Sequence, residues 1–164
     1  MKPCCSLFKI PDLCFVFVGS KKNGYLSTME LVHRLHLTSK VHFLGYVPDI
    51  DMPELYRRAR ALLMPTYYGP TNIPPLEAMA LGCPVAASRI YGMPEQLGEA
   101  ALYFDPGSVG QIAEAMKRLW TDDSLCRELS SRGLTRSSRW NQSHFNQKLR
   151  EILESVLAGK PRRT

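Results

Sequence analysis

The chain reads PTYYGPTNIPPLEAMALGCPV from Pro65 to Val85, and no other stretch says more about its architecture. A short apolar run ends at Pro65, a loop of turn-forming residues follows, and a helical pattern begins near Leu76. Gly82 suits the end of that helix, and residues 84–87 are apolar enough for a buried strand. This order of strand, loop, helix and strand predicts one parallel β-α-β unit.

Strand and helix patterns alternate in the same way on both sides of this unit. Predicted strands cover 14–18, 41–44, 61–64, 84–87 and 101–104, and predicted helices cover 25–37, 53–59, 76–81, 93–98, a segment capped by Ser108, 123–139 and 144–158. We therefore predict an α/β fold: a Rossmann-like parallel sheet flanked by helices, with a C-terminal helical extension.

The chain has 164 residues, of which 45% are hydrophobic, and this predicts one domain over 1–158 and a basic tail over 159–164. Its longest apolar stretch, Leu13 to Val18, is far below the roughly 20 residues that span a bilayer. We expect a cytoplasmic protein. Five scattered cysteines fit neither a disulfide framework nor a metal-binding spacing.

The positive charge is concentrated near the C-terminus. Residues 1–116 have 10 Lys and Arg against 10 Asp and Glu, whereas residues 117–164 have 11 against 5. A basic end of this kind is typical of a surface that meets an anionic membrane, nucleic acid or an acidic partner domain. A solvated face is the simplest interpretation; a peripheral membrane or interdomain contact ranks next, and no nucleic-acid partner is expected.

The loop and helix start in the quoted stretch have the properties of a phosphate site. A helix N-terminus presents unpaired backbone N–H groups and partial positive charge. Pro74 and Pro75 lack an N–H, which leaves the amides of Thr71, Asn72, Ile73 and Leu76 as expected donors to a diphosphate, with the side chains of Thr71 and Asn72 as further donors.

Glu77 lies in the first turn of the predicted helix and admits two interpretations. A carboxylate there stabilises the helix dipole by roughly 0.3–1 kcal/mol, which is reason enough for its presence. Alternatively, an acceptor-only carboxylate beside a phosphate site is suited to binding the two vicinal hydroxyls of a ribose.

Four segments together resemble the C-terminal domain of glycosyltransferase family four, the glycogen-synthase-like group with the GT-B fold. They are FLGYV at 43–47, LYRRA at 55–59, ALLMP at 61–65 and PPLEAMALGCPV at 74–85. The similarity runs in order from about Pro11 to Leu157. It implies a retaining hexosyltransferase that uses a nucleoside diphosphate sugar and no metal or other cofactor.

The resemblance also implies roles for individual residues. The family has two glutamates eight positions apart, which contact the donor sugar and the ribose; Glu77 matches the second, and Gly69 stands in place of the first. Pro70 to Ile73 match the loop that supplies amides to the sugar and phosphates. Tyr46 and Val47 match the segment that lies against the nucleobase.

Other parts of the family pattern have no counterpart in this sequence. These are the first strand of the domain, an Arg and a Lys that neutralise the diphosphate, and the N-terminal acceptor-binding domain. We therefore expect weak donor binding and a need for an N-terminal domain or partner chain. Lys21 and Lys22 are candidate replacement cations, although a solvated pair in a loop is the simpler interpretation. Without the central first strand, the neighbouring strands should have unpaired edges.

Three functions remain open from the sequence. The first is the donor-binding part of a hexosyltransferase, the second is a non-catalytic nucleotide-binding or interaction module, and the third is a basic surface module for membrane or nucleic acid. The four histidines have no carboxylate or cysteine at ligand spacing, so we expect no metal site.

Overall fold

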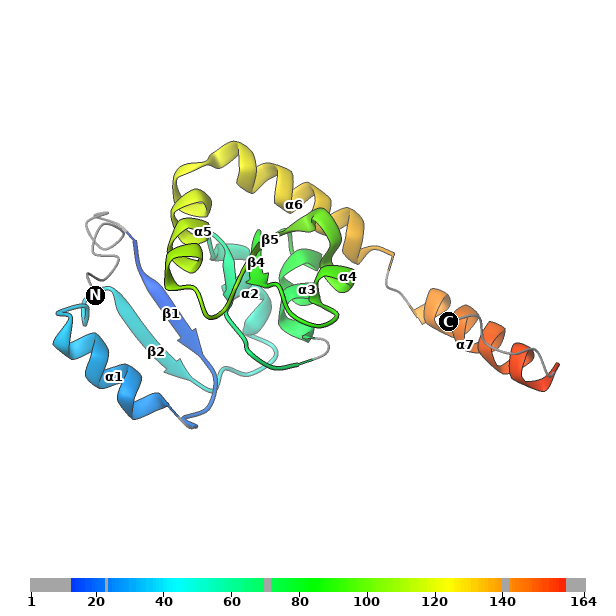
Figure 1. Ribbon diagram of the computed structural model, residues 1–164, viewed down its shortest axis with the longest axis horizontal. Coiled ribbons are helices and arrows are strands. Elements are labelled where there is room, and N and C mark those ends of the chain that lie inside the picture. The colour runs from blue at the N-terminus through cyan, green and yellow to red at the C-terminus, as the bar shows by residue number, and fades with distance from the viewer. Residues whose placement is uncertain (1–12, 23, 70–71, 140–141, 159–164) are drawn as a thin grey trace.

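The computed structural model describes residues 13–22, 24–69, 72–139 and 142–158 (Figure 1). Strands and helices alternate through most of this range, as the sequence predicts. The strands are β1 (Phe15–Val18), β2 (Val41–Gly45), β3 (Leu62–Met64), β4 (Val85–Ser88) and β5 (Ala101–Phe104). The helices are α1 (Tyr25–Arg34), α2 (Met52–Arg58), α3 (Ile73–Ala80), α4 (Met93–Leu97), α5 (Val109–Thr121), α6 (Asp123–Ser137) and α7 (Gln142–Leu157), with a 3-10 turn at Gly98–Ala100.

The described strands form two parallel sheets. β1 pairs with β2, and β3, β4 and β5 form a separate three-stranded sheet in that order. A doubly wound sheet has the strand order 3-2-1-4-5-6. The two sheets match positions 3-2 and 4-5-6 of this order, and no described strand fills position 1. The α/β class is confirmed, and the break falls where the sequence predicts unpaired strand edges.

The core lies on both faces of the three-stranded sheet. Val85 and Ala87 of β4 point to one face, where they pack with residues of α2, α3 and α4. Ala86 points to the other face and packs with Phe104 and with residues of α5 and α6. Because both faces are covered, all four residues of β4 are buried, as a central parallel strand requires.

Two helix boundaries show how local sequence sets the fold. The α5 helix begins after Ser108, whose hydroxyl accepts a hydrogen bond from the Gln111 N–H at 3.3 Å, so the predicted cap is confirmed. The α3 helix begins at Ile73, three residues before the predicted start at Leu76. Pro74 and Pro75 fall in its first turn, where a missing N–H costs no intrahelical bond.

The C-terminal helices differ in how much they contact. Arg136 of α6 donates to the backbone carbonyls of Glu95 and Gln96, so α6 is tied to α4. In contrast, α7 has no buried residue and extends away from the other elements in Figure 1. No described helix is long and apolar enough to cross a membrane.

Candidate functional site

The candidate site is the start of α3, which follows the loop after β3. In Figure 1 this loop lies on the same lower side of the molecule as the ends of β1 and β2. The carboxyl ends of strands are where open α/β sheets bind ligands. The structure therefore places the start of α3 in the position that the sequence predicts for a binding site.

Glu77 is an exposed residue at the fifth position of α3, so it lies in the second turn and not in the first turn that the sequence predicted, because α3 begins before Leu76. One of its carboxylate oxygens, Oε2, accepts a hydrogen bond from the hydroxyl of Tyr56 on α2 at 3.1 Å. Its other oxygen, Oε1, receives no hydrogen bond from the described residues. Glu77 thus faces solvent with one oxygen held by protein and the other open to a ligand.

Asn72 precedes α3 and is held by α4. Its backbone N–H donates to Gln96 Oε1 at 3.2 Å, and its carbonyl accepts from Gln96 Nε2 at 3.1 Å. Its side-chain Nδ2 contacts Met93 Sδ at 3.2 Å. The sequence predicts the N–H and the carboxamide of Asn72 as donors to a diphosphate. In the structure both donors have protein partners, because the buried Gln96 has to satisfy its own amide.

Gly69 has a backbone conformation that favours glycine. Its φ is +123°, and a Cβ built at this position would lie 3.0 Å from Asn72 Oδ1. An L-residue here would be strained and would displace the Asn72 side chain. In this loop conformation position 69 therefore favours glycine over any residue with a side chain.

The remaining predicted residues differ in how they are placed. Pro70 and Thr71 lie outside the described residues. Ile73 is exposed at the first position of α3, where its N–H has no acceptor within the helix, and Leu76 is partly buried against the core. Tyr46 is exposed and Val47 is half-buried, and both follow the end of β2.

Exposed aromatic rings lie close to this site in the chain. Tyr67 and Tyr68 follow β3, and Tyr91 follows β4. Tyr68 and Tyr91 meet edge to face with ring centroids 6.3 Å apart, and the Tyr67 hydroxyl donates to the Pro106 carbonyl at 2.7 Å. These contacts join the loops after β3, β4 and β5 into one surface at the edge of the sheet.

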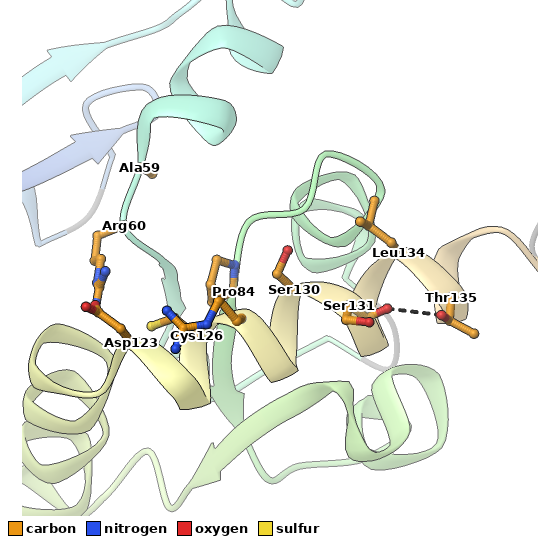
Figure 2. Close-up of a pocket in the computed structure, with 10 residues that line it drawn as sticks. Ala59, Arg60, Pro84, Asp123, Cys126, Ser130, Ser131, Leu134 and Thr135 are labelled. Carbon is orange, nitrogen blue, oxygen red and sulfur yellow. Dashed lines mark hydrogen bonds and ion pairs between the residues drawn. The ribbon is translucent and has the colours of Figure 1, made fainter.

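A groove of the described surface lies elsewhere, between α6 and the segment before β3 (Figure 2). It has a volume of about 680 Å³, and Arg60, Asp123 and Cys126 line it. Arg60 pairs with Asp123 and donates to the carbonyls of Leu119 and Trp120. These charges therefore hold the junction of α5 and α6 together, and the groove lies at the amino ends of β3 and β4, away from Glu77.

Sequence reasoning did not identify two of the residues that shape the site, Tyr56 and Gln96. Each is more than 20 positions from its partner and comes from a different helix. The only local signal was that Tyr56 belongs to the segment LYRRA at 55–59, one of the four that resemble the family. The described residues contain no group of three His, Cys, Asp or Glu side chains that suits a metal ion.

Fold and site together define an α/β domain with an exposed carboxylate, that of Glu77, near the carboxyl end of β3. Residues 5–136 match the model of the family described as glycosyl transferases group 1, so the chain belongs to this family of glycosyltransferases. The resemblance identified from the four sequence segments is thereby confirmed at the level of the family.

Individual relatives agree with this assignment. The chain is 37% identical over 112 residues to the O-antigen chain mannosyltransferase B of Escherichia coli, an alignment that covers 68% of this chain and 29% of that protein. Its fold is similar to sucrose-phosphate synthase from Thermosynechococcus elongatus, with a TM-score of 0.81 and 24% identity over 95% of this chain and 41% of that one.

A third similar structure is Alr3699/HepE from Anabaena in complex with UDP. Its TM-score is 0.80 at 24% identity, over 92% of this chain and 43% of that one. At this identity the likeness shows the fold alone. The chain spans less than half of the length of each of these three proteins.

Proposed function

We propose that this chain is the donor-binding part of a hexosyltransferase that uses a nucleoside diphosphate sugar. The reaction transfers the hexosyl group to an acceptor hydroxyl with retention of the anomeric configuration, and it needs no metal ion. The observation that carries the proposal is the exposed Glu77 carboxylate in the second turn of α3, the helix that follows the carboxyl end of β3. The mannosyltransferase relative supports a sugar donor, and the UDP complex of HepE supports a nucleoside diphosphate.

Each part of the donor has a candidate partner at this site. Glu77 accepts hydrogen bonds from the ribose hydroxyls, while the N–H of Ile73 and the loop at residues 69–71 contact the diphosphate. Tyr46 and Val47 lie against the nucleobase. Asn72 is the candidate for the sugar contact, because its Oδ1 lies where a side chain at position 69 would begin.

The full reaction requires a second domain or a partner chain that binds the acceptor. The exposed apolar side chains of α7 support this requirement. Phe145, Leu149, Ile152 and Val156 recur at helical spacing along α7, and all four are exposed. We place the assembled enzyme in the cytoplasm, with contact to the membrane surface as the peripheral alternative.

Calorimetric titration of the folded chain with UDP, GDP and ADP tests the donor site. We expect one of the three to bind weakly, and Glu77→Ala to weaken that binding about tenfold or more, because a hydrogen bond to a charged group contributes about 1.5–3 kcal/mol. Glu95→Ala is the matched control, since Glu95 is also an exposed helix carboxylate but lies in the first turn of α4. If no nucleotide binds at millimolar concentration, or if both variants behave alike, the proposal is wrong.

A second candidate function is nucleotide binding without transfer, and Gly69 is the observation that favours it. Glycine offers no side chain to the donor sugar, so a ligand could be held by its nucleotide alone. Titration with a nucleoside diphosphate and with its hexose conjugate separates the two functions. A transferase site should bind the conjugate more tightly, whereas a nucleotide module should bind both equally.

A further inference from the structure

Tyr56 lies on α2, 21 positions before Glu77, and reaches it across the interface between α2 and α3. Its side chain is only 6% exposed and belongs to the same buried cluster as Ala78 and Met79, the two residues that follow Glu77. A tyrosine ring in a packed core has little rotational freedom, since only two torsions place it. The hydroxyl is therefore a hydrogen-bond donor at a fixed position beside α3.

The direction of this hydrogen bond does not change over the accessible pH range. Burial and then the hydrogen bond to the Glu77 carboxylate raise the pKa of Tyr56 well above its ordinary value. The phenol keeps its proton, and an ionised carboxylate only accepts. Tyr56 thus donates to Glu77 Oε2 whenever Glu77 is charged.

This contact limits the orientations of an otherwise exposed glutamate. A free glutamate side chain samples many rotamers, and a ligand that orders it has to oppose that entropy. In the structure Oε2 is already held at 3.1 Å from the Tyr56 hydroxyl, while no described residue donates to Oε1. The carboxylate is ordered before a ligand arrives, and one oxygen stays available.

We propose that Tyr56 is a positioning residue that orients the Glu77 carboxylate toward the two vicinal hydroxyls of the donor ribose. The inference rests on the proposed function, because it assigns to Tyr56 the orientation of the same carboxylate. Its consequence is specific: Tyr56 contributes to the selection of ribonucleotides over 2′-deoxyribonucleotides. A tyrosine that only stabilised the interface between α2 and α3 would affect both kinds of nucleotide equally.

The test compares the ribonucleoside diphosphate that binds, among UDP, GDP and ADP, with its 2′-deoxy counterpart. We expect the unmodified chain to prefer the ribonucleotide by about tenfold. Tyr56→Phe removes only the hydroxyl and should weaken ribonucleotide binding by roughly three- to tenfold, the effect of losing one ordered side chain. Binding of the deoxynucleotide, which keeps only the 3′-hydroxyl, should weaken less, so the preference shrinks.

Tyr103→Phe is the matched control. The Tyr103 hydroxyl is also partly buried and donates to the Gly98 carbonyl at 2.6 Å, not to Glu77. We expect this variant to keep the ribonucleotide preference of the unmodified chain. All titrations are made at a temperature at which circular dichroism shows each variant folded, so that a loss of folding does not imitate a loss of binding.

The outcomes separate this inference from the proposed function. If the unmodified chain has no ribonucleotide preference, or if Glu77→Ala keeps it, the proposed function fails. If Glu77→Ala abolishes the preference but Tyr56→Phe keeps it, the proposed function stands and the role of Tyr56 is overturned. Equal weakening of both nucleotides by Tyr56→Phe also overturns it. The double variant should match Glu77→Ala alone.

Discussion

The two sheets of this protein differ in how well their strands are covered. In β4, at the centre of the three-stranded sheet, Val85, Ala86 and Ala87 are all 0% exposed. In β1, the equally apolar Val16, Phe17 and Val18 are 43–49% exposed. A parallel strand is stable when both of its faces and both of its edges are covered. The same kind of sequence is therefore core in one sheet and surface in the other.

This difference divides the candidate site between a firm part and a loosely packed part. Glu77 and Asn72 lie beside the well-packed three-stranded sheet. Glu77 is hydrogen-bonded to Tyr56, and Asn72 is hydrogen-bonded to Gln96. Tyr46 and Val47 follow β2 of the sparsely covered sheet. We therefore expect the residues that contact the ribose and the diphosphate to be in place before a ligand binds. The nucleobase contacts should depend on how well β1 and β2 are packed.

The largest expected effect is a difference in stability loss between alanine replacements of one phenylalanine in each sheet. Phe104 is 1% exposed in β5, and its replacement by alanine should lower the free energy of unfolding by about 3–5 kcal/mol. Phe17 stacks on Phe43 at 5.1 Å but faces solvent, so Phe17→Ala should cost only about 1 kcal/mol. Urea denaturation measures both. Equal losses would mean that the two sheets are covered equally well.

Thiol reactivity should show the same contrast. Cys14 is exposed just before β1, whereas Cys83 is buried in the segment between α3 and β4. Burial raises the pKa of the Cys83 thiol to about 11, so only about 0.1% of it is thiolate at pH 8. Iodoacetamide at pH 8, followed by peptide mass spectrometry, should label Cys14 first and Cys83 at least about a hundredfold more slowly.

The raised pKa of Cys83 also makes the stability of the fold depend on pH. Its neutral form stabilises the fold fully below the unfolded thiol pKa of about 8.5, and this contribution is lost as the pH rises toward 11. Similar labelling rates for Cys14 and Cys83 at pH 8 would show that the α3 region opens as readily as the β1 region.

The smallest expected effect concerns the loop before α3. Gly69→Ala introduces a Cβ at a φ of +123° and 3.0 Å from Asn72 Oδ1, so it should destabilise the chain by about 1–2 kcal/mol. Gly110→Ala is the control, because Gly110 lies in the first turn of α5 with space around it. That change should stabilise by up to about 1 kcal/mol. Thermal melts that move in the same direction would contradict the strain at Gly69.

Local patterns were sufficient for most of the fold. The alternation of apolar runs and helical spacing predicted all five described strands, and β5 has the predicted bounds, Ala101 to Phe104. The start of α3 was predicted three residues late, because Ile73 and two prolines resemble a loop until the helix is seen to begin there. The break between β1 and β3, which no described strand bridges, was also predicted.

The site was predictable only in part. The residue types around Glu77 pointed to a helix start beside a loop, and the structure has that arrangement. The hydrogen bonds from Tyr56 to Glu77 and between Gln96 and Asn72 join different helices, and no local pattern in the sequence encodes such contacts. Packing of α2 and α4 against α3 creates them, so they appear only once the tertiary fold is known.

The most direct test of the account is a crystal structure of the chain with the nucleoside diphosphate that it binds. We predict that the ribose hydroxyls lie within about 2.5–3.2 Å of Glu77 Oε1, with the Tyr56 hydroxyl still on Oε2 and the diphosphate at the start of α3. A nucleotide seated in the groove of Figure 2, beside Arg60 and Asp123, or a ribose without contact to Glu77, would contradict it.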